Sequence, residues 1–223
     1  GEVKNLTISD SISMSSANYV GAVAGDSKGN ITNCHTTSSV SVSGKGYIGG
    51  IVGELDSNIS VSKCSNLAKV AATGNYAGGI AGRVYSNASE ALTDSYNAGS
   101  VEGASFVGGI TGSLYMGGTV EGVYSIGSVK ASAEAGVAGG VVGEFRYGHI
   151  KNAYSAGSVS TAAVGNAGGI AGSLGYKPES VDRVYYLDST AEEAVGKEGD
   201  YAIQNGSILP KTSDELKVLT CGV

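Results

Sequence analysis

The sequence predicts an all-β fold: a right-handed parallel β-solenoid (β-helix) of about six coils, each of about 29 residues with three short strands. A glycine-rich block recurs with its last glycine at positions 25, 53, 82, 112, 143 and 172, so the steps are 28, 29, 30, 31 and 29 residues. Glycine supplies 37 of 223 residues and proline only 2, which fits neither collagen nor a disordered linker. Sustained helical spacing of apolar residues is absent. The right hand follows from the general rule for parallel crossovers.

The glycine-rich block predicts one of the three short strands of each coil. Its copies occupy residues 20–25, 48–53, 77–82, 107–112, 138–143 and 167–172. Equivalent residues of successive coils should stack about 4.8 Å apart. The block therefore predicts two inward ladders, which are Ile51, Ile80, Ile110, Val141 and Ile170, and Leu55, Val84, Leu114, Phe145 and Leu174. The glycines at 53, 82, 112 and 143 are expected where opposing walls approach closely.

A second block, of the form V-x-N-[CA], lies halfway between glycine blocks, and a third block ending in G-x-V follows it. The second block predicts an inward ladder of Leu6, Cys34, Cys64, Ser95, Val123, Ala153 and Val184. The third predicts a ladder of Val40, Val70, Val101, Val129 and Val159. Each period thus supplies three apolar segments, separated by corners rich in Gly, Ser and Asn.

The repeats divide the chain into a solenoid over residues 1–188 and a C-terminal cap or junction segment over 189–223. Residues 1–19 are expected to form an N-terminal cap or a first partial coil. Caps are required because the open ends of a solenoid are unpaired sheet edges that recruit other chains.

The C-terminal segment is predicted as a polar loop followed by a short helix near residues 213–219. Thr212 and Glu215 fit a capping box, in which the two side chains satisfy the first free N–H groups of a helix. Gly222 is suited to end that helix.

The 13 tyrosines predict two aromatic columns. One follows the second block and contains Tyr96, Tyr124, Tyr154 and Tyr185. The other precedes the glycine pair and contains Tyr19, Tyr47, Tyr76 and Phe106. A column of this kind is either a structural stack that covers the corners or a contact stripe for a glycan or a protein. Under the second interpretation, the first column supplies the binding residues.

Two of the three cysteines, Cys34 and Cys64, occupy equivalent positions one rung apart. They are either stacked, buried free thiols or a disulfide. Cys221 is left without a partner in the pattern. A zinc site built on Cys34, His35 and Cys64 lacks a fourth ligand, so the sequence predicts no metal and no cofactor.

The outward position after the third glycine reads Glu54, Arg83, Ser113, Glu144 and Ser173 along the chain. Glu54 and Arg83 are expected to form a surface ion pair of little energetic worth. Glu144 should lie three rungs from Glu54, about 14 Å away, which is too far for paired-carboxylate catalysis. The chain contains no H-E-x-x-H motif. We therefore expect no enzyme activity and assign no catalytic residues.

Charge and hydropathy exclude two classes of partner. The 14 basic and 20 acidic residues give a net charge of −6, which is unsuited to binding a nucleic acid. The longest apolar runs are far too short to cross a bilayer, so no membrane insertion is expected in this segment. No basic–apolar leader begins the sequence, so its location cannot be read from a targeting signal.

The alternation of G-G-[IV]-x-G with V-x-N-[CA]-Y-[SN]-x-G-x-V over residues 20–190 resembles the GLUG repeat. Its best copies are 107–129 and 138–159, and residues 184–188 and 212–217 resemble the segment that follows such arrays. GLUG repeats occur in large bacterial surface proteins, including the immunoglobulin A metallopeptidase family and haemagglutinin-like adhesins. The resemblance implies a secreted or cell-surface location. It does not bring the peptidase activity, because the zinc motif is missing.

The leading hypothesis is a non-catalytic bacterial cell-surface scaffold or adhesion module that spaces or presents neighbouring domains of a longer polypeptide. One alternative is a carbohydrate-binding module that uses Tyr96, Tyr124 and Tyr154. Another is an accessory repeat domain of a secreted peptidase or glycosidase. The partners expected under these hypotheses are a host or cell-surface protein, or a glycan.

Overall fold

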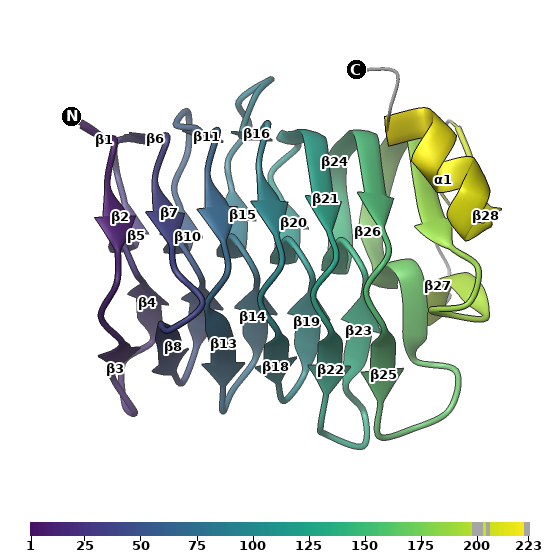
Figure 1. Ribbon diagram of the computed structural model, residues 1–223, viewed down its shortest axis with the longest axis horizontal. Coiled ribbons are helices and arrows are strands. Elements are labelled where there is room, and N and C mark those ends of the chain that lie inside the picture. Colours follow the sequence, from purple (N-terminus) through teal and green to yellow (C-terminus); the bar gives the residue numbers. More distant parts are fainter. Residues whose placement is uncertain (198–202, 204–205, 221–223) are drawn as a thin grey trace.

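The computed structural model describes residues 1–197, 203 and 206–220, and it confirms the all-β parallel solenoid (Figure 1). The described strands form one 22-stranded sheet and one six-stranded sheet, and the pairings from coil to coil run parallel. Strands β1, β2 and β3 lie at one end of the long axis, and helix α1 (Ser213–Thr220) lies at the other. The molecule is therefore a rod whose axis crosses the strands.

Each regular coil contains five short strands, at positions that we name a to e in chain order. Position a holds β1 (Glu2–Lys4), β6 (Asn30–Thr32), β11 (Val61–Ser62) and β16 (Leu92–Thr93). Position b holds β2 (Thr7–Ile8), β7 (His35–Thr36), β12 (Ser65–Asn66), β17 (Tyr96–Asn97) and β28 (Ile208–Lys211). Position c, the six-stranded sheet, holds β3 (Ile12–Ser13), β8 (Ser41–Gly44), β13 (Lys69–Ala72), β18 (Val101–Gly103), β22 (Val129–Ala131) and β25 (Val159–Thr161).

Positions d and e complete the coil. Position d holds β4 (Tyr19–Gly21), β9 (Tyr47–Gly49), β14 (Tyr76–Gly78), β19 (Phe106–Gly108) and β23 (Val137–Gly139). Position e holds β5 (Ala24–Ser27), β10 (Val52–Leu55), β15 (Ala81–Tyr85), β20 (Thr111–Tyr115) and part of β27 (Glu193–Lys197). Three longer strands run through several positions, namely β21 (Thr119–Ser125), β24 (Val142–Ser155) and β26 (Ala167–Leu187).

The corner between positions a and b has a left-handed backbone in each coil. The residues there have φ angles between 48° and 64°, and they are Asn5, Asn33, Lys63, Asp94, Gly122, Asn152 and Arg183. Asn, Asp and Gly adopt this conformation at the least cost. The corner coincides with the third residue of the second repeat block. It divides what the sequence predicted as one strand into two, which is one reason for five strands per coil rather than three.

The corner between positions d and e is a glycine pair because side chains do not fit there. A Cβ on Gly50 would collide with the Gly79 carbonyl oxygen and the Asn66 side chain. The third glycine of the block also lies at a close approach, as predicted: a Cβ on Gly53 would lie 2.8 Å from the Tyr47 carbonyl oxygen. The Gly50 contacts bring the glycine corner of one coil against position b of the neighbouring coil, on the opposite wall.

This close approach divides the core into two lobes. Opposite the glycine pairs lies a buried ladder of position b, formed by Thr36, Asn66, Asn97, Ser125, Ser155 and Tyr186. On one side of this seam, the larger lobe contains Ile51, Leu55 and Phe145. On the other side, the smaller lobe contains Ile48 and Val101 and is closed by the six-stranded sheet, which runs along the lower edge of Figure 1. The two apolar clusters are separate, so each coil has a waist.

The predicted inward ladders hold with two corrections. The ladder from Leu55 to Leu174 is in register and buried throughout. In the valine ladder, Val70 pairs with Val42 and not with Val40. The corner after β7 is two residues longer than in the next coil, and Val40 is buried in that corner. Leu6 is 41% exposed because no rung precedes it in the described chain.

The C-terminal end differs from the predicted polar loop. Strands β27 and β28 both pair in parallel with β26, so pairing with the preceding rung recurs beyond Asp188, at residues 193–197 and 208–211. Ladder hydrogen bonds need only the backbone, so a polar sequence can extend the sheet. The capping box is confirmed: the Thr212 N–H donates to Glu215 Oε2 at 2.9 Å, and the Glu215 N–H donates to Thr212 Oγ1 at 3.3 Å. The predicted helix end at Gly222 lies outside the described residues.

Candidate functional site

The predicted tyrosine stripe is a register column of position b. Tyr96, Tyr124, Tyr154 and Tyr185 follow one another rung by rung. The first three rings stack nearly parallel, with centroids 4.9 and 5.0 Å apart, and all four residues are half-buried. Burial raises the pKa of Tyr124 and of Tyr154. Inside such a stack, each ring face is covered by the next ring. The column therefore offers ring edges and hydroxyl groups, and not the flat faces on which a sugar would stack.

Two further aromatic columns flank positions d and e. The predicted column of Tyr19, Tyr47, Tyr76 and Phe106 is confirmed, with centroids 5.0 to 5.2 Å apart. A third column was not predicted, and it contains Tyr85, Tyr115, Tyr147 and Tyr176. Its signal was present in the sequence, because Tyr85 and Tyr115 directly follow the ladder residues Val84 and Leu114.

Glu54 and Arg83 form an ion pair that is more buried than predicted. Arg83 Nε donates to Glu54 Oε2 at 2.5 Å, and Arg83 Nη2 contacts the same oxygen. The Glu54 and Arg83 side chains are only 12% and 23% exposed, because the guanidinium lies over the rings of Tyr47 and Tyr85, 4.3 and 4.9 Å from their centroids. Desolvation by burial raises the pKa of Glu54, while Arg83 opposes the rise. The pair is thus part of the wall and not a mobile surface contact.

Glu144 occupies the same column three rungs away, between Ser113 and Ser173. Its Oε2 accepts long hydrogen bonds from Ser113 Oγ and Tyr76 Oη at 3.4 and 3.5 Å, and Arg146 lies 3.8 Å from Oε1. Burial raises the pKa of the Glu144 carboxyl group. The separation of three rungs from Glu54 is confirmed, so these carboxylates do not form a catalytic pair.

Cys34 and Cys64 are free thiols, both buried in the larger lobe. The Cys34 N–H donates to Cys64 Sγ at 3.4 Å, and burial raises the pKa of the Cys64 thiol to about 11. Of the two interpretations left open by the sequence, the structure has the stacked thiols. Cys221 lies outside the described residues. His35 bonds Asn33 and Ser65, and no group of three or more His, Cys, Asp and Glu in the described chain could hold a metal ion.

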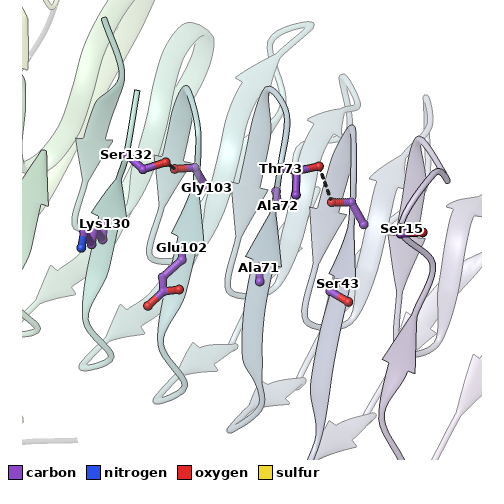
Figure 2. A pocket seen from close by; sticks show the side chains of 10 residues that line it. Ser15, Ser43, Ala71, Ala72, Thr73, Glu102, Gly103, Lys130 and Ser132 are labelled. Carbon is purple, nitrogen blue, oxygen red and sulfur yellow. Dashed lines mark hydrogen bonds between the residues drawn. The ribbon is translucent and has the colours of Figure 1, made fainter. Parts of the chain in front are cut away.

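A groove of about 330 Å³ lies on the outer face of the six-stranded sheet (Figure 2). Its lining comes from five consecutive coils, from β3 to β22 and the corners that follow these strands. The lining residues are Ser15, Ser43, Gly44, Ala71, Ala72, Thr73, Glu102, Gly103, Lys130 and Ser132. The floor is formed by small residues, while hydroxyl groups stand at the corners and two charged side chains lie at one end (Figure 2).

The groove was not predicted from the sequence. Its signal is the outward column of position c, in which Ser43, Ala71, Glu102 and Lys130 follow one another in register. The first two side chains are much shorter than the last two, so the surface is hollowed over the second and third coils. A search for inward ladders passes over such outward positions.

No described helix has the length and apolarity that crossing a bilayer requires. No protein-family model matches the chain, and no curated protein matches it either. One solved structure is similar: a crystal structure from Bacteroides ovatus titled a "putative immunoglobulin A1 protease". It superposes with a TM-score of 0.71 at 23% sequence identity, over 100% of this chain and 70% of that one. At this identity, the likeness shows a shared fold.

Proposed function

We propose that this chain is a non-catalytic scaffold module of a secreted or cell-surface bacterial protein, which spaces and presents neighbouring domains or takes part in adhesion. The observation that carries the proposal is the regular rod. Parallel rungs repeat from β1 to β28 around two filled apolar lobes, and the first strands and α1 lie at opposite ends of the long axis (Figure 1). A domain joined at each end would be held apart by the rod.

The chemistry of the described side chains supports a passive role. Arg83 neutralises Glu54, Glu144 has no partner carboxylate within one rung, and the Cys64 thiol is buried and held protonated. A reactive cysteine needs the opposite surroundings, which are exposure and a lowered pKa. We therefore propose that the chain contributes no catalytic group, and that any hydrolytic activity of a longer protein comes from another domain.

The similar structure supports a place within a larger protein. The Bacteroides ovatus protein is named for a protease, and the fold of this chain matches 70% of it. An accessory repeat domain of a peptidase is consistent with that match, but 23% identity does not transfer an activity. Adhesion, the external location and contacts with host or cell-surface partners rest on the resemblance of the repeats.

The spacer role can be tested by removing one coil. Residues 84–113 span one full period, because Arg83 pairs with Ser113 and Val84 with Leu114, so their deletion joins two equivalent positions. Spin labels at Ser13 and Ser160 lie in one outward column of position c, five rungs apart. We expect the label distance to shorten by about 5 Å, in a background with the three cysteines replaced by alanine.

The outcome separates a rod from a deformable chain. A narrow distance distribution that shifts by one rung supports the spacer. A distribution that stays at the same distance after the deletion, or that is broad in both proteins, would refute it. Circular dichroism shows whether the shortened chain keeps its β-structure. If this chain by itself hydrolysed peptide or glycosidic bonds, the non-catalytic role would be refuted independently.

A further inference from the structure

The groove on the six-stranded sheet runs along the axis of the rod. Ser15 belongs to the first coil and Lys130 to the fifth, so the lining crosses four rung steps, about 19 Å in all. The volume of about 330 Å³ is within the range of ligand sites. A ligand in this groove would lie across the strands and would meet an equivalent side chain once per rung.

Hydroxyl oxygens at the corners are available as acceptors. Thr73 Oγ1 donates to the Gly44 carbonyl at 3.4 Å, and Ser132 Oγ donates to the Gly103 carbonyl at 3.1 Å (Figure 2). A hydroxyl that donates its single proton to a carbonyl keeps its lone pairs, so it accepts a hydrogen bond from a ligand hydroxyl. All lining hydroxyl groups belong to serine and threonine, and the lining contains no aromatic ring.

The charges at one end of the groove do not cancel. Glu102 pairs with Lys69 at 3.0 Å, and both side chains are about half exposed. Lys130 is next to Glu102 in register and exposed, and within the described chain its ammonium group has no ion pair within 4.0 Å. One positive charge is therefore left over, on a protein whose net charge is −6. An anionic group on the ligand would fit at this point.

An extended peptide matches this surface poorly. Peptide strands add to sheets through free N–H and C=O groups at an edge. In the floor of this groove, β8, β13, β18 and β22 are interior strands whose backbone groups already bond their neighbours along the axis. The side chains on one face of an extended peptide repeat every ~6.6 Å, whereas the rungs are ~4.8 Å apart, so a peptide along the axis would not stay in step with them. A chain of sugar rings has a repeat closer to the rung spacing and carries hydroxyl groups on every ring.

We propose that this groove binds an extended acidic glycan along the rod axis. The ring hydroxyl groups donate to Thr73, Ser132 and the Glu102 carboxylate, and a uronate carboxylate accepts from the Lys130 ammonium group. This site is separate from the tyrosine column and from the spacer role. A failure of glycan binding would leave the coil-deletion result unaffected.

The test is calorimetric titration of the full chain with an oligogalacturonate, and with a neutral cello-oligosaccharide of the same length. We expect the acidic chain to bind, and the neutral chain to bind at least about tenfold more weakly. Lys130→Glu should lower the affinity for the acidic chain by about tenfold or more and leave the affinity for the neutral chain unchanged. Ala71→Trp, which fills the floor, should abolish binding of both.

Lys151→Glu is the matched control, because Lys151 pairs with Glu121 in the strands of position a, outside the groove lining. It should leave the affinity unchanged, and circular dichroism should show that each variant keeps its β-structure. Three results would overturn the proposal. These are that the acidic chain does not bind, that its affinity does not change with Lys130→Glu, or that Lys151→Glu lowers that affinity as much as Lys130→Glu does. Displacement of the glycan by a neutral extended peptide would also overturn it, because the groove would then be a peptide site.

Discussion

The two lobes of the coil have the same rung spacing but are filled by side chains of different size. The larger lobe holds isoleucines, leucines and Phe145, nearly all fully buried. The smaller lobe holds mainly valine and alanine, and its sheet includes Gly44 and Gly103. A Cβ on Gly103 would lie 2.8 Å from the Val107 side chain, so an alanine there would force that side chain to move. Side-chain volume, and not strand pairing, therefore sets the cross-section of each lobe.

The seam between the lobes should be the position least tolerant of change. In Gly79→Ala, the added Cβ would collide with the Gly109 carbonyl oxygen and the Asn97 side chain, which are both fixed in ladders. We expect the free energy of unfolding, measured in urea, to fall by more than about 5 kcal/mol, or the variant to fail to fold. Gly165→Ala is the control, because its corner has φ of 84° and open space, and only about 1 kcal/mol of backbone strain is expected. Equal losses would show that the seam is not special.

Truncations within the two lobes should differ in proportion to the volume removed. Phe145→Ala empties a fully buried site in the larger lobe, and we expect it to lower the free energy of unfolding by about 3–5 kcal/mol. Val101→Ala, equally buried in the smaller lobe, should cost about 2 kcal/mol. Chemical denaturation of both variants, with unchanged m-values, measures the difference. Similar losses would mean that the small lobe is as tightly packed as the large one and that volume alone does not distinguish them.

The smallest effect is expected at Glu144, on the outer wall of the larger lobe. Because burial raises the pKa of this carboxyl above 4.5, its value in an open chain, the folded state binds the proton more tightly than the unfolded state does. The contribution of Glu144 to stability therefore falls as the pH rises from 4.5 through the raised pKa of the folded state. Glu144→Gln should raise the melting temperature by a few degrees at pH 7, and the gain should shrink toward pH 4.5.

Glu102→Gln, on the wall of the smaller lobe, is the matched control for this prediction. Its ion pair with Lys69 is about half exposed, so the substitution should change stability by less than about 1 kcal/mol. A Glu144→Gln variant that is less stable than the parent at pH 7 would show that the long contacts to Ser113, Tyr76 and Arg146 outweigh the desolvation of the carboxylate.

The ladders could be predicted from the sequence because equivalent residues recur at one period and a stacked rung needs the same size and polarity in each copy. The Ile51 and Leu55 ladders and both predicted aromatic columns follow from this rule. The pairing of Val70 with Val42 could not be predicted, because a corner that is two residues longer preserves the pattern on both sides while shifting the register. The family resemblance is not matched by a family model.

The features of the candidate sites depend on contacts across a coil, which a one-dimensional period does not contain. Asn66 and Asn97 look like ordinary corner residues until the glycine pairs are found to pack against them. Arg83 reads as a surface cation, yet it is covered by tyrosines from two different strand positions. The groove is formed by short outward side chains, and its function is a proposal that the repeat pattern alone does not suggest.

The direction of the ladder hydrogen bonds has a mechanical consequence. Bonds such as Ile51 N–H to the Ile80 carbonyl, at 3.0 Å, join one coil to the next, whereas the covalent chain winds around the axis. Tension applied to the two ends of the chain would peel off a terminal coil and break its bonds a few at a time. Each released coil of about 29 residues adds roughly 100 Å of extended chain. The rod would then lengthen in steps under force, one coil at a time. An attached body would stay connected while each step absorbs part of the load.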